Sequence, residues 1–354
     1  MKNIKLFYKV LFAALISTSF FTCCEKSPPP LTEEEKTAKI LDEYPVKYIE
    51  LQGEAADKNA EFSGLAWFGN HLILLPQYPF NFSEGGKGNL FTISKRQIYD
   101  YLNSENQTPI EPEKIGFIAD GLERFNQWGS GYEAIVFNQD TVYCLIESMD
   151  EISTVGYIVS GIIDNVNKII TLDSSSLKKI PSEINLFNFS DEAIVISGNN
   201  IIAIKESNGK NINVESKVSV FNKLLNSVQS LPITNIEYRI TDATGIDNNN
   251  NFWAINYFYP GEYEQLKPAA DSIIINFGVG RSHLKSPVVE RLLEFHIGEN
   301  EIYNTDKLPT YLKLNEGVDS RNWEGIVRLD SAGFLIITDR FPKTLFGFVA
   351  FKLN

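Results

Sequence analysis

The stretch RNWEGIVRLDSAGFLIITDRFP, residues 321–342, decides the fold, because its pattern recurs along the chain. Glu324 precedes a small residue, Gly325, and a run of β-branched residues. A polar turn follows, and a second apolar run ends at Asp339 and Arg340. Two apolar runs joined by a short polar turn predict an antiparallel hairpin. A carboxylate at the start of a buried strand is uncommon, so its repetition is informative.

The same phrase occurs in five segments: FSGLAWFGNHLILLPQ (62–77), YEAIVFNQDTVYCLIES (132–148), DEAIVISGNNIIAIKES (191–207), ATGIDNNNNFWAINYF (243–258) and WEGIVRLDSAGFLIITDR (323–340). Further strand-like runs lie between these hairpins. Sets of four antiparallel strands repeated radially predict an all-β fold, a five-bladed β-propeller. The last repeat lacks one strand, and PVKYIELQ (45–52) is available to complete it and to close the ring. The alternative is six blades, with a further blade within residues 80–130.

The first strand of each blade lies beside the central tunnel of a propeller, where the blades converge. Crowding there predicts small residues, and the phrase has them at Gly64, Ala134, Ala193, Gly245 and Gly325.

The residue before each small residue should then lie at the tunnel mouth. These residues are Ser63, Glu133, Glu192, Thr244 and Glu324. Several carboxylates around one axis repel one another, and a hard cation would relieve the repulsion. Oxygen ligands without Cys or His favour Ca²⁺. We therefore predict a calcium site formed by these five residues, and the alternative is a polar plug held by shared protons and waters.

The N-terminus has the pattern of an export signal. Residues 1–22 contain three lysines and then an apolar run that ends at Cys23 and Cys24, which predicts a bacterial lipoprotein signal with Cys23 as the lipidated residue. Cys24 as the lipidated residue and an ordinary cleaved signal are the alternatives. We predict a signal peptide over 1–22, a flexible tether over 23–43 and the propeller over 44–354. The protein would be attached to a bacterial membrane, at the outer membrane or the cell surface.

The chain is acidic, with a formal net charge of −13, and removal of three lysines with the signal would make it −16. Such a surface argues against nucleic-acid binding. Beyond the two cysteines at the anchor, Cys144 is alone, so no disulfide framework is expected. Its place in an alternating strand predicts a small core residue. We expect a monomer.

The ordered set of Ser63, Glu133, Glu192, Thr244 and Glu324, together with WEGI (323–326), resembles the calcium-activated nucleotidase (apyrase) family. That resemblance implies a five-bladed propeller with a central Ca²⁺ held by a Ser/Glu set of this order, and hydrolysis of nucleoside di- and triphosphates. Thr244 replaces a family serine. The family's Asp-Asp-Arg-Thr-Gly stretch and its paired arginines are absent, and PQYPFNFSEGGKG (76–88) and IKESNGK (204–210) stand in their places. The EGI and DR phrases also give a looser likeness to phytase-like esterase propellers.

The loops at the tunnel mouth should carry the chemistry. In a phosphohydrolase, Lys205, Arg321 and Arg340 would hold phosphate charge, and Glu147 or Asp339 would accept a proton from water. The same face is predicted to carry Trp128, Asp150, Glu206, Arg239, Asp242, Tyr257 and Asn322. The segment 260–285 interrupts the fourth repeat and is predicted to be a lid or a partner-binding loop.

Two functions follow from these residues. The first is a Ca²⁺-dependent phosphohydrolase that acts on phosphoester or phosphoanhydride substrates at the cell surface. The second is a non-catalytic propeller that binds an extracellular glycan or protein. The two differ in how many cationic side chains converge on the site, because phosphate chemistry needs at least two.

Overall fold

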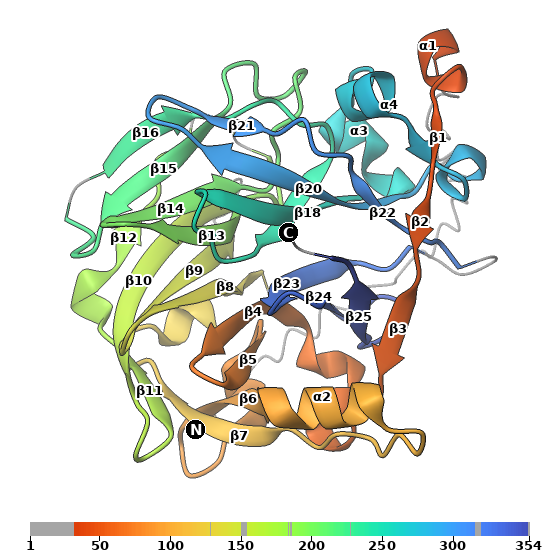
Figure 1. Cartoon of the computed structure of the whole chain (residues 1–354). Helices are drawn as coiled ribbons and strands as arrows, with labels where there is room; N and C mark the ends of the chain where they lie inside the picture. Colours follow the sequence, from red (N-terminus) through yellow and green to blue (C-terminus); the bar gives the residue numbers. More distant parts are fainter. Residues whose placement is uncertain are drawn as a thin grey trace, which may run out of the picture.

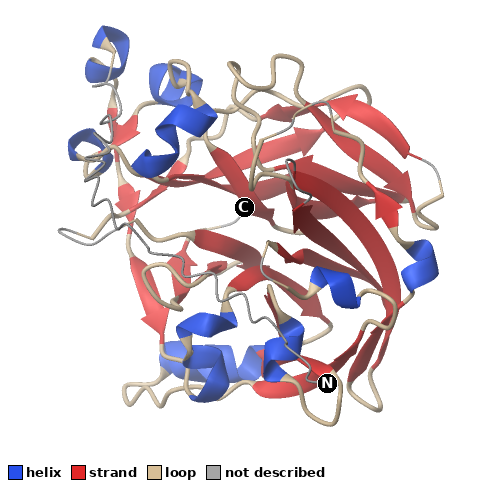
Figure 2. Cartoon of the chain, turned by 180° about the vertical axis from the view of Figure 1, so that it is seen from behind, coloured by secondary structure: helices blue, strands red, loops and turns tan. Residues whose placement is uncertain are grey.

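The five hairpins predicted from the repeats are all present in a computed structural model, which describes residues 32–127, 129–149, 154–182, 184, 186–226, 228–315 and 320–352. The predicted signal peptide, Cys23, Trp128 and Asp150 lie outside these residues. Each hairpin supplies the first two strands of an antiparallel unit (Figure 1). Strands fill the body of the molecule and the helices lie around its edge (Figure 2).

The first two units are joined at their outer strands. The first consists of β4 (Phe62–Phe68), β5 (His71–Pro76), β6 (Gly88–Ser94) and β7 (Glu113–Ile118), with helix α2 (Lys95–Asn103) between the last two. The second consists of β8 (Ser130–Asn138), β9 (Thr141–Met149), β10 (Thr154–Asp164) and β11 (Ile169–Leu172), and β12 (Lys178–Lys179) pairs with β10. Strand β7 pairs in parallel with β11. Residues 80–130 therefore complete the first unit with β6 and β7.

The third and fourth units follow the same order of strands. The third consists of β13 (Asp191–Ser197), β14 (Asn200–Lys205), β15 (Lys217–Asn222) and β16 (Val228–Pro232). The fourth consists of β17 (Arg239–Ala243), β18 (Asn251–Phe258), β20 (Val289–Ile297), β21 (Ile302–Asn304) and β22 (Thr310–Leu312). The segment between β18 and β20 folds as α3 (Tyr263–Leu266), α4 (Ser272–Phe277) and β19 (Val279–Gly280).

The last unit is completed by the N-terminal segment, as the sequence predicted. It consists of β23 (Trp323–Leu329), β24 (Gly333–Thr338), β25 (Phe346–Ala350) and β3 (Val46–Ile49). Strand β3 pairs antiparallel with β25, so both ends of the domain lie in one sheet. The segment before β3 also joins the fourth unit, because β1 (Ile40–Leu41) pairs with β19 and β2 (Glu43–Tyr44) pairs with β22. Helix α1 (Glu33–Lys36) contacts α4.

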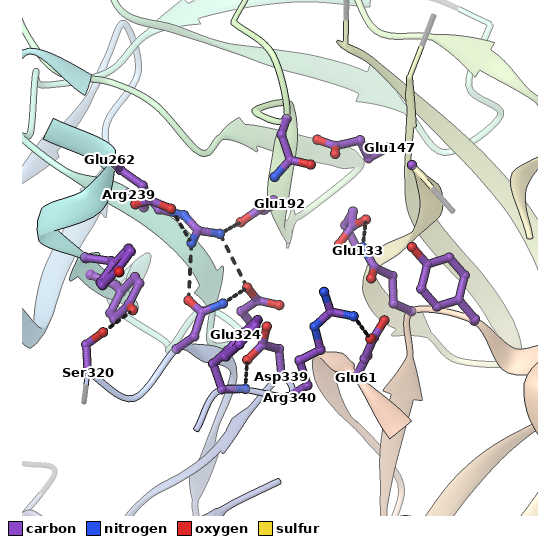
Figure 3. A pocket seen from close by; sticks show the side chains of 18 of the residues that line it. Glu61, Glu133, Glu147, Glu192, Arg239, Glu262, Ser320, Glu324, Asp339 and Arg340 are labelled. Atoms are coloured by element: carbon purple, nitrogen blue, oxygen red, sulfur yellow. Dashed lines mark hydrogen bonds and ion pairs between the residues drawn. The ribbon is translucent and has the colours of Figure 1, made fainter. Parts of the chain in front are cut away.

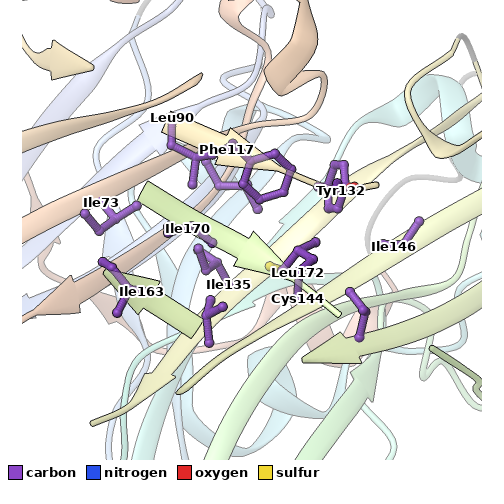
Figure 4. Packing of buried hydrophobic residues seen from close by; sticks show 14 of the residues in the cluster. Ile73, Leu90, Phe117, Tyr132, Ile135, Cys144, Ile146, Ile163, Ile170 and Leu172 are labelled. Atoms are coloured by element: carbon purple, nitrogen blue, oxygen red, sulfur yellow. The ribbon is translucent and has the colours of Figure 1, made fainter. Parts of the chain in front are cut away.

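The innermost strands of the described units form a closed ring, in which β4 contacts β8, β8 contacts β13, β13 contacts β17, β17 contacts β23 and β23 contacts β4. A separate cluster of buried side chains lies between each neighbouring pair of units. The cluster between the first two units includes Ile73, Phe117, Ile135 and Cys144 (Figure 4). Cys144 is fully buried there, as predicted for a core residue. Radial units packed side by side in this way form a β-propeller.

Short 3₁₀ helices connect several strands: Gly53–Ala56, Lys58–Ala60, Pro79–Phe82, Glu123–Phe125, Ser174–Ser176, Pro260–Glu262 and His283–Lys285. Among the described residues, no helix is both long enough and apolar enough to span a lipid bilayer.

Candidate functional site

A β-bulge interrupts the pairing of the innermost strand at the same place in every unit. The skipped residues are Ser63, Glu133, Glu192 and Glu324 in four of the units. A bulge turns an extra side chain out of the regular alternation of a strand. The predicted position of these residues at the tunnel mouth therefore has a local cause, which is the bulge before each small residue.

The fourth unit differs from the predicted alignment. Its bulge holds Thr241 and Asp242, and Thr244 lies beyond β17. The Thr241 hydroxyl donates to the carbonyl of Trp323 in the next unit at 2.6 Å, and the Ser63 hydroxyl donates to the carbonyl of Tyr132 at 2.5 Å. Both hydroxyls thus link neighbouring innermost strands. Thr244 accepts a hydrogen bond from the backbone N–H of Trp253.

The prediction of crowding at the small residues holds in the last unit and is wrong in the fourth. A Cβ on Gly325 would lie 2.6 Å from the side chain of Ile337 and 3.3 Å from the backbone of Gly64. No described heavy atom lies within 4 Å of the place where a Cβ on Gly245 would be. The shifted alignment explains this, because Ala243 is the residue that follows the bulge in β17.

The bulges open onto a cavity of about 630 Å³ at the mouth of the ring (Figure 3). Its lining includes seven acidic residues: Glu61, Glu133, Glu147, Glu192, Glu262, Glu324 and Asp339. Two arginines, Arg239 and Arg340, are the cationic residues among the described lining residues. The remaining lining residues are Gln77, Tyr78, Gly129, Met149, Phe187, Asn188, Tyr257, Tyr259, Ser320, Asn322, Phe341 and Pro342.

The cavity contains three of the five residues predicted to bind calcium. Glu133, Glu192 and Glu324 line it, whereas the hydroxyls of Ser63 and Thr244 are bonded to backbone groups. The described residues contain no group of three or more His, Cys, Asp or Glu side chains arranged to hold a metal ion. The hydroxyls of Ser63 and Thr244 are thus engaged with the backbone, and the calcium site stays a prediction.

The predicted catalytic residues fall into two groups. Glu147, Asp339 and Arg340 line the cavity. Arg321 is buried in an ion pair with Glu290, and Lys205 pairs with Asp191 at 3.2 Å and lines another cavity beside β15 and β16. Of the further residues predicted for this face, Arg239, Tyr257 and Asn322 also line the cavity.

Arg239 is the central cation of this site. Its guanidinium forms ion pairs with Glu206, with Glu192 at 3.5 Å, with Glu262 at 3.4 Å and with Glu324 at 3.4 Å. Its Nη1 also donates to the Asn322 amide oxygen at 3.2 Å. Glu262 comes from the segment that interrupts the fourth repeat, which therefore forms part of the cavity wall.

The carboxyl groups away from Arg239 have fewer partners. Glu133 accepts a hydrogen bond of 2.8 Å from the Gln77 amide. Glu147 is buried, and its Oε2 has no hydrogen-bond partner among the described residues. Arg340 pairs with Glu61 on the opposite side of the cavity from Arg239. On the Arg239 side, Oε1 of Glu262 pairs with Arg239, and its Oε2 has no hydrogen-bond partner among the described residues.

Burial makes these carboxyl groups weaker acids than exposed ones, because it raises their pKa values. It raises the pKa of Glu133 to about 8, with the neighbouring charge of Glu147 adding to the effect. Burial likewise raises the pKa of Glu147 to about 7 and that of Asp339 to about 6. The pKa values of Glu192 and Glu324 are raised well above the ordinary range, by burial first and then by nearby carboxyl groups. Protonated and ionised carboxyl groups therefore coexist near neutral pH.

Sequence reasoning missed Glu61, Gln77, Tyr78 and Glu262 as lining residues. Gln77 and Tyr78 directly follow the first hairpin, at the place where Asp339 and Arg340 follow the last one, so the repeat itself contained that signal. Glu262 had no such signal, because its segment has no counterpart in the other repeats.

No family model matches the sequence, and neither does any curated protein. Among solved structures, the chain is similar to a glucose dehydrogenase at 10% identity, with 86% of this chain and 99% of that chain covered and a TM-score of 0.44. It is similar to a Cellvibrio cellulosa α-L-arabinanase mutant at 7% identity, with 82% and 90% covered and a TM-score of 0.42. It is also similar to the catalytic domain of a Coprinopsis cinerea GH62 α-L-arabinofuranosidase at 8% identity, with 87% and 96% covered and a TM-score of 0.44.

Proposed function

We propose that this protein binds a neutral, polyhydroxylated ligand, a segment of a glycan, in the cavity at the propeller mouth. The volume of about 630 Å³ suits one or a few sugar rings. Aromatic rings with apolar faces, such as Tyr259 and Phe341, are exposed at the cavity, and carboxyl and amide groups lie between them. This combination of rings and hydrogen-bonding groups supports a sugar ligand.

The carboxyl groups supply the means to cleave a glycosidic bond. Such hydrolysis uses one protonated carboxyl as the acid and one carboxylate as the base or nucleophile. Glu147 and Asp339 both line the cavity. Glu147, with a pKa of about 7, is the candidate acid, and Asp339, with a pKa of about 6, is the candidate carboxylate. Water then adds to the anomeric carbon as the glycosidic bond breaks. The single observation that carries this proposal is the lining of the cavity, in which seven carboxyl groups lie together with exposed aromatic rings.

The charges of the cavity disfavour an anionic substrate. Arg239 and Arg340 are both ion-paired with glutamates, and Lys205 and Arg321 are paired elsewhere. A phosphate group in this cavity would meet carboxyl groups in place of the two or more cations that phosphate chemistry needs.

A Ca²⁺-dependent phosphohydrolase is the second candidate. The observation that favours it is that the Oε2 atoms of Glu147 and Glu262 have no hydrogen-bond partner among the described residues, because a buried carboxylate oxygen without a partner is a potential ligand for a cation. A bound calcium would supply the positive charge that phosphate requires. This calcium stays a prediction, and the experiment below includes it.

Export and anchoring are a further part of the proposal. The pattern of residues 1–24 supports a lipid-attached protein at a bacterial membrane, with Cys23 as the modified residue. A propeller held at the cell envelope in this way would meet extracellular glycans.

The test is a binding and activity screen on the purified protein. Glycan fragments are titrated by calorimetry, and chromogenic glycosides and phosphate esters are assayed with added calcium and with a chelator. We expect glycan binding and glycoside cleavage, with Glu147→Gln and Asp339→Asn each losing at least tenfold in turnover. Glu301→Gln, at an exposed position outside the cavity, is the matched control and should behave as wild type. Calcium-dependent release of phosphate without any glycan binding would instead establish the second candidate.

A further inference from the structure

A cation that the chain itself supplies contacts four of the glutamates at the acidic cavity. Arg239 starts β17, and its side chain is 8% exposed. The glutamates around it come from four separate places in the sequence: the start of β13, the end of β14, the segment after β18 and the start of β23. One side chain therefore ties together segments that span three units of the propeller.

The position of the guanidinium coincides with part of the predicted metal site. Its Nη2 atom lies 3.5 Å from Oε2 of Glu192 and 3.4 Å from Oε1 of Glu324. Both residues belong to the set from which the sequence predicts a calcium site. A single nitrogen that lies between these two carboxyl groups takes the place where a shared cation would be coordinated.

The chemistry of the guanidinium suits this role. Arginine stays charged even when buried, and its planar fork carries five donors that can bind several carboxylates at once. The surrounding glutamates raise the pKa of Arg239 well above its ordinary value although burial opposes this. A buried charge is stable only with partners of opposite sign, and each member of this cluster supplies that for the others.

We propose that the guanidinium of Arg239 replaces a bound metal ion at the propeller mouth, as an internal cation that is covalently part of the chain. Such a cation cannot dissociate. The protein therefore keeps its cavity assembled without free calcium, and chelators leave it intact. Arg239 supplies one positive charge that four glutamates on its own side of the cavity share. Glu133 and Glu147 lie outside its ion-pair contacts and line the cavity, where a ligand can meet them.

The first measurement needs no substitution. The full-length chain, purified in detergent, is unfolded by heat with a chelator, with added CaCl₂, and with neither, and Ca²⁺ is titrated into it by calorimetry. We expect one unfolding midpoint under all three conditions and no calcium binding. A lower midpoint in chelator would show that a metal ion is already bound, and a stoichiometric heat of calcium binding would show that the site accepts one. Either result overturns the proposal.

The second measurement removes the internal cation. In Arg239→Gln the glutamates lose their shared partner, so the unfolding midpoint should fall, and added Ca²⁺ should recover part of the loss. Methylguanidinium should recover part of it as well, because it restores the missing group. Arg328→Gln is the matched control. Among the described residues this part-buried arginine has a single ion pair, with Asp247, and it donates to the carbonyl of Asn251, so its loss should create no response to either cation. If Arg239→Gln folds and responds to neither Ca²⁺ nor methylguanidinium, the proposal fails. If Arg239→Gln does not fold, the chelator and calcium measurements on the wild-type protein still test the proposal.

Discussion

Glu290 on β20 and Arg321, which lies just before β23, form a buried ion pair with an Nη2–Oε2 distance of 2.7 Å. Glu290 also accepts hydrogen bonds from the Arg321 backbone N–H at 2.9 Å and from the Trp323 indole at 2.8 Å. The fourth unit thereby fixes the start of the innermost strand of the last unit. Arg321 thus supports the wall of the mouth cavity from outside.

Replacement of Arg321 should reduce stability. Arg321→Met leaves the buried Glu290 carboxylate without its cation, and the loss of one partner of a buried pair costs about 3–5 kcal/mol. Denaturant unfolding measures this cost. Arg340→Met is the matched comparison, because its pair with Glu61 is partly exposed and such pairs contribute about 0–1 kcal/mol. Stability equal to wild type in Arg321→Met, together with weaker ligand binding, would contradict the structural role.

The cavity carboxyl groups should make the protein less stable as the pH rises. The pKa of Glu133 is raised from 4.5 to about 8 in the folded state, so the native protein holds more protons than the unfolded chain between these values. The contribution of Glu133 to the free energy of unfolding is fully present below pH 4.5 and is lost as the pH rises through about 8. Urea unfolding across this window should show a falling free energy of unfolding, and Glu133→Gln should flatten the slope.

The control for this pH dependence is Glu113, whose pKa is lowered, first by its hydrogen bond from Lys168. A lowered pKa gives stability that is present above 4.5 and lost at more acid pH. Glu113→Gln should therefore leave the slope between 4.5 and 8 as it is in wild type. If Glu133→Gln and Glu113→Gln give the same slope, Glu133 does not carry the proton.

The N-terminal closing segment should be essential to the domain. A chain that begins at Gly53 lacks β1, β2 and β3, which pair with strands of the last two units. The exposed edge of β25 and the loss of buried Ile49 should lower the midpoint of thermal unfolding. A chain that begins at Thr32 keeps all three strands and serves as the control. Equal midpoints for the two chains would show that the closing strand adds nothing to stability.

The lipid anchor is tested by fractionation. Cys23→Ser should leave the protein unlipidated and move it from the membrane fraction to the soluble fraction. Cys24→Ser is the control, because it removes the neighbouring thiol alone. If only Cys24→Ser releases the protein from the membrane fraction, Cys24 is the lipidated residue.

The sequence by itself determined the repeated parts of this protein. Alternating apolar runs and Asn, Asp or Gly turns encode hairpins locally, so all five hairpins and the closing strand could be located without coordinates. Repetition also indicated which residues meet, since equivalent positions in radial units lie at the same end. Glu133, Glu147, Glu192, Glu324, Asp339 and Arg340 were placed at the mouth on that ground, and all of them line the cavity.

Only the tertiary structure decided the register of the fourth unit and the partner of the carboxyl groups. In residues 241–245, TDATG, a polar residue precedes a small one twice, Asp242 before Ala243 and Thr244 before Gly245. Pairing with β18 places the bulge at Thr241 and Asp242 and leaves Thr244 beyond the strand. Likewise, a lone arginine before a strand does not reveal that four glutamates from other segments surround it. Strand register depends on long-range hydrogen bonding and packing, and the partners of a buried charge depend on which segments the closed ring brings within a few ångströms. Neither the register of a strand nor the partners of a buried charge is encoded in a local pattern of residues.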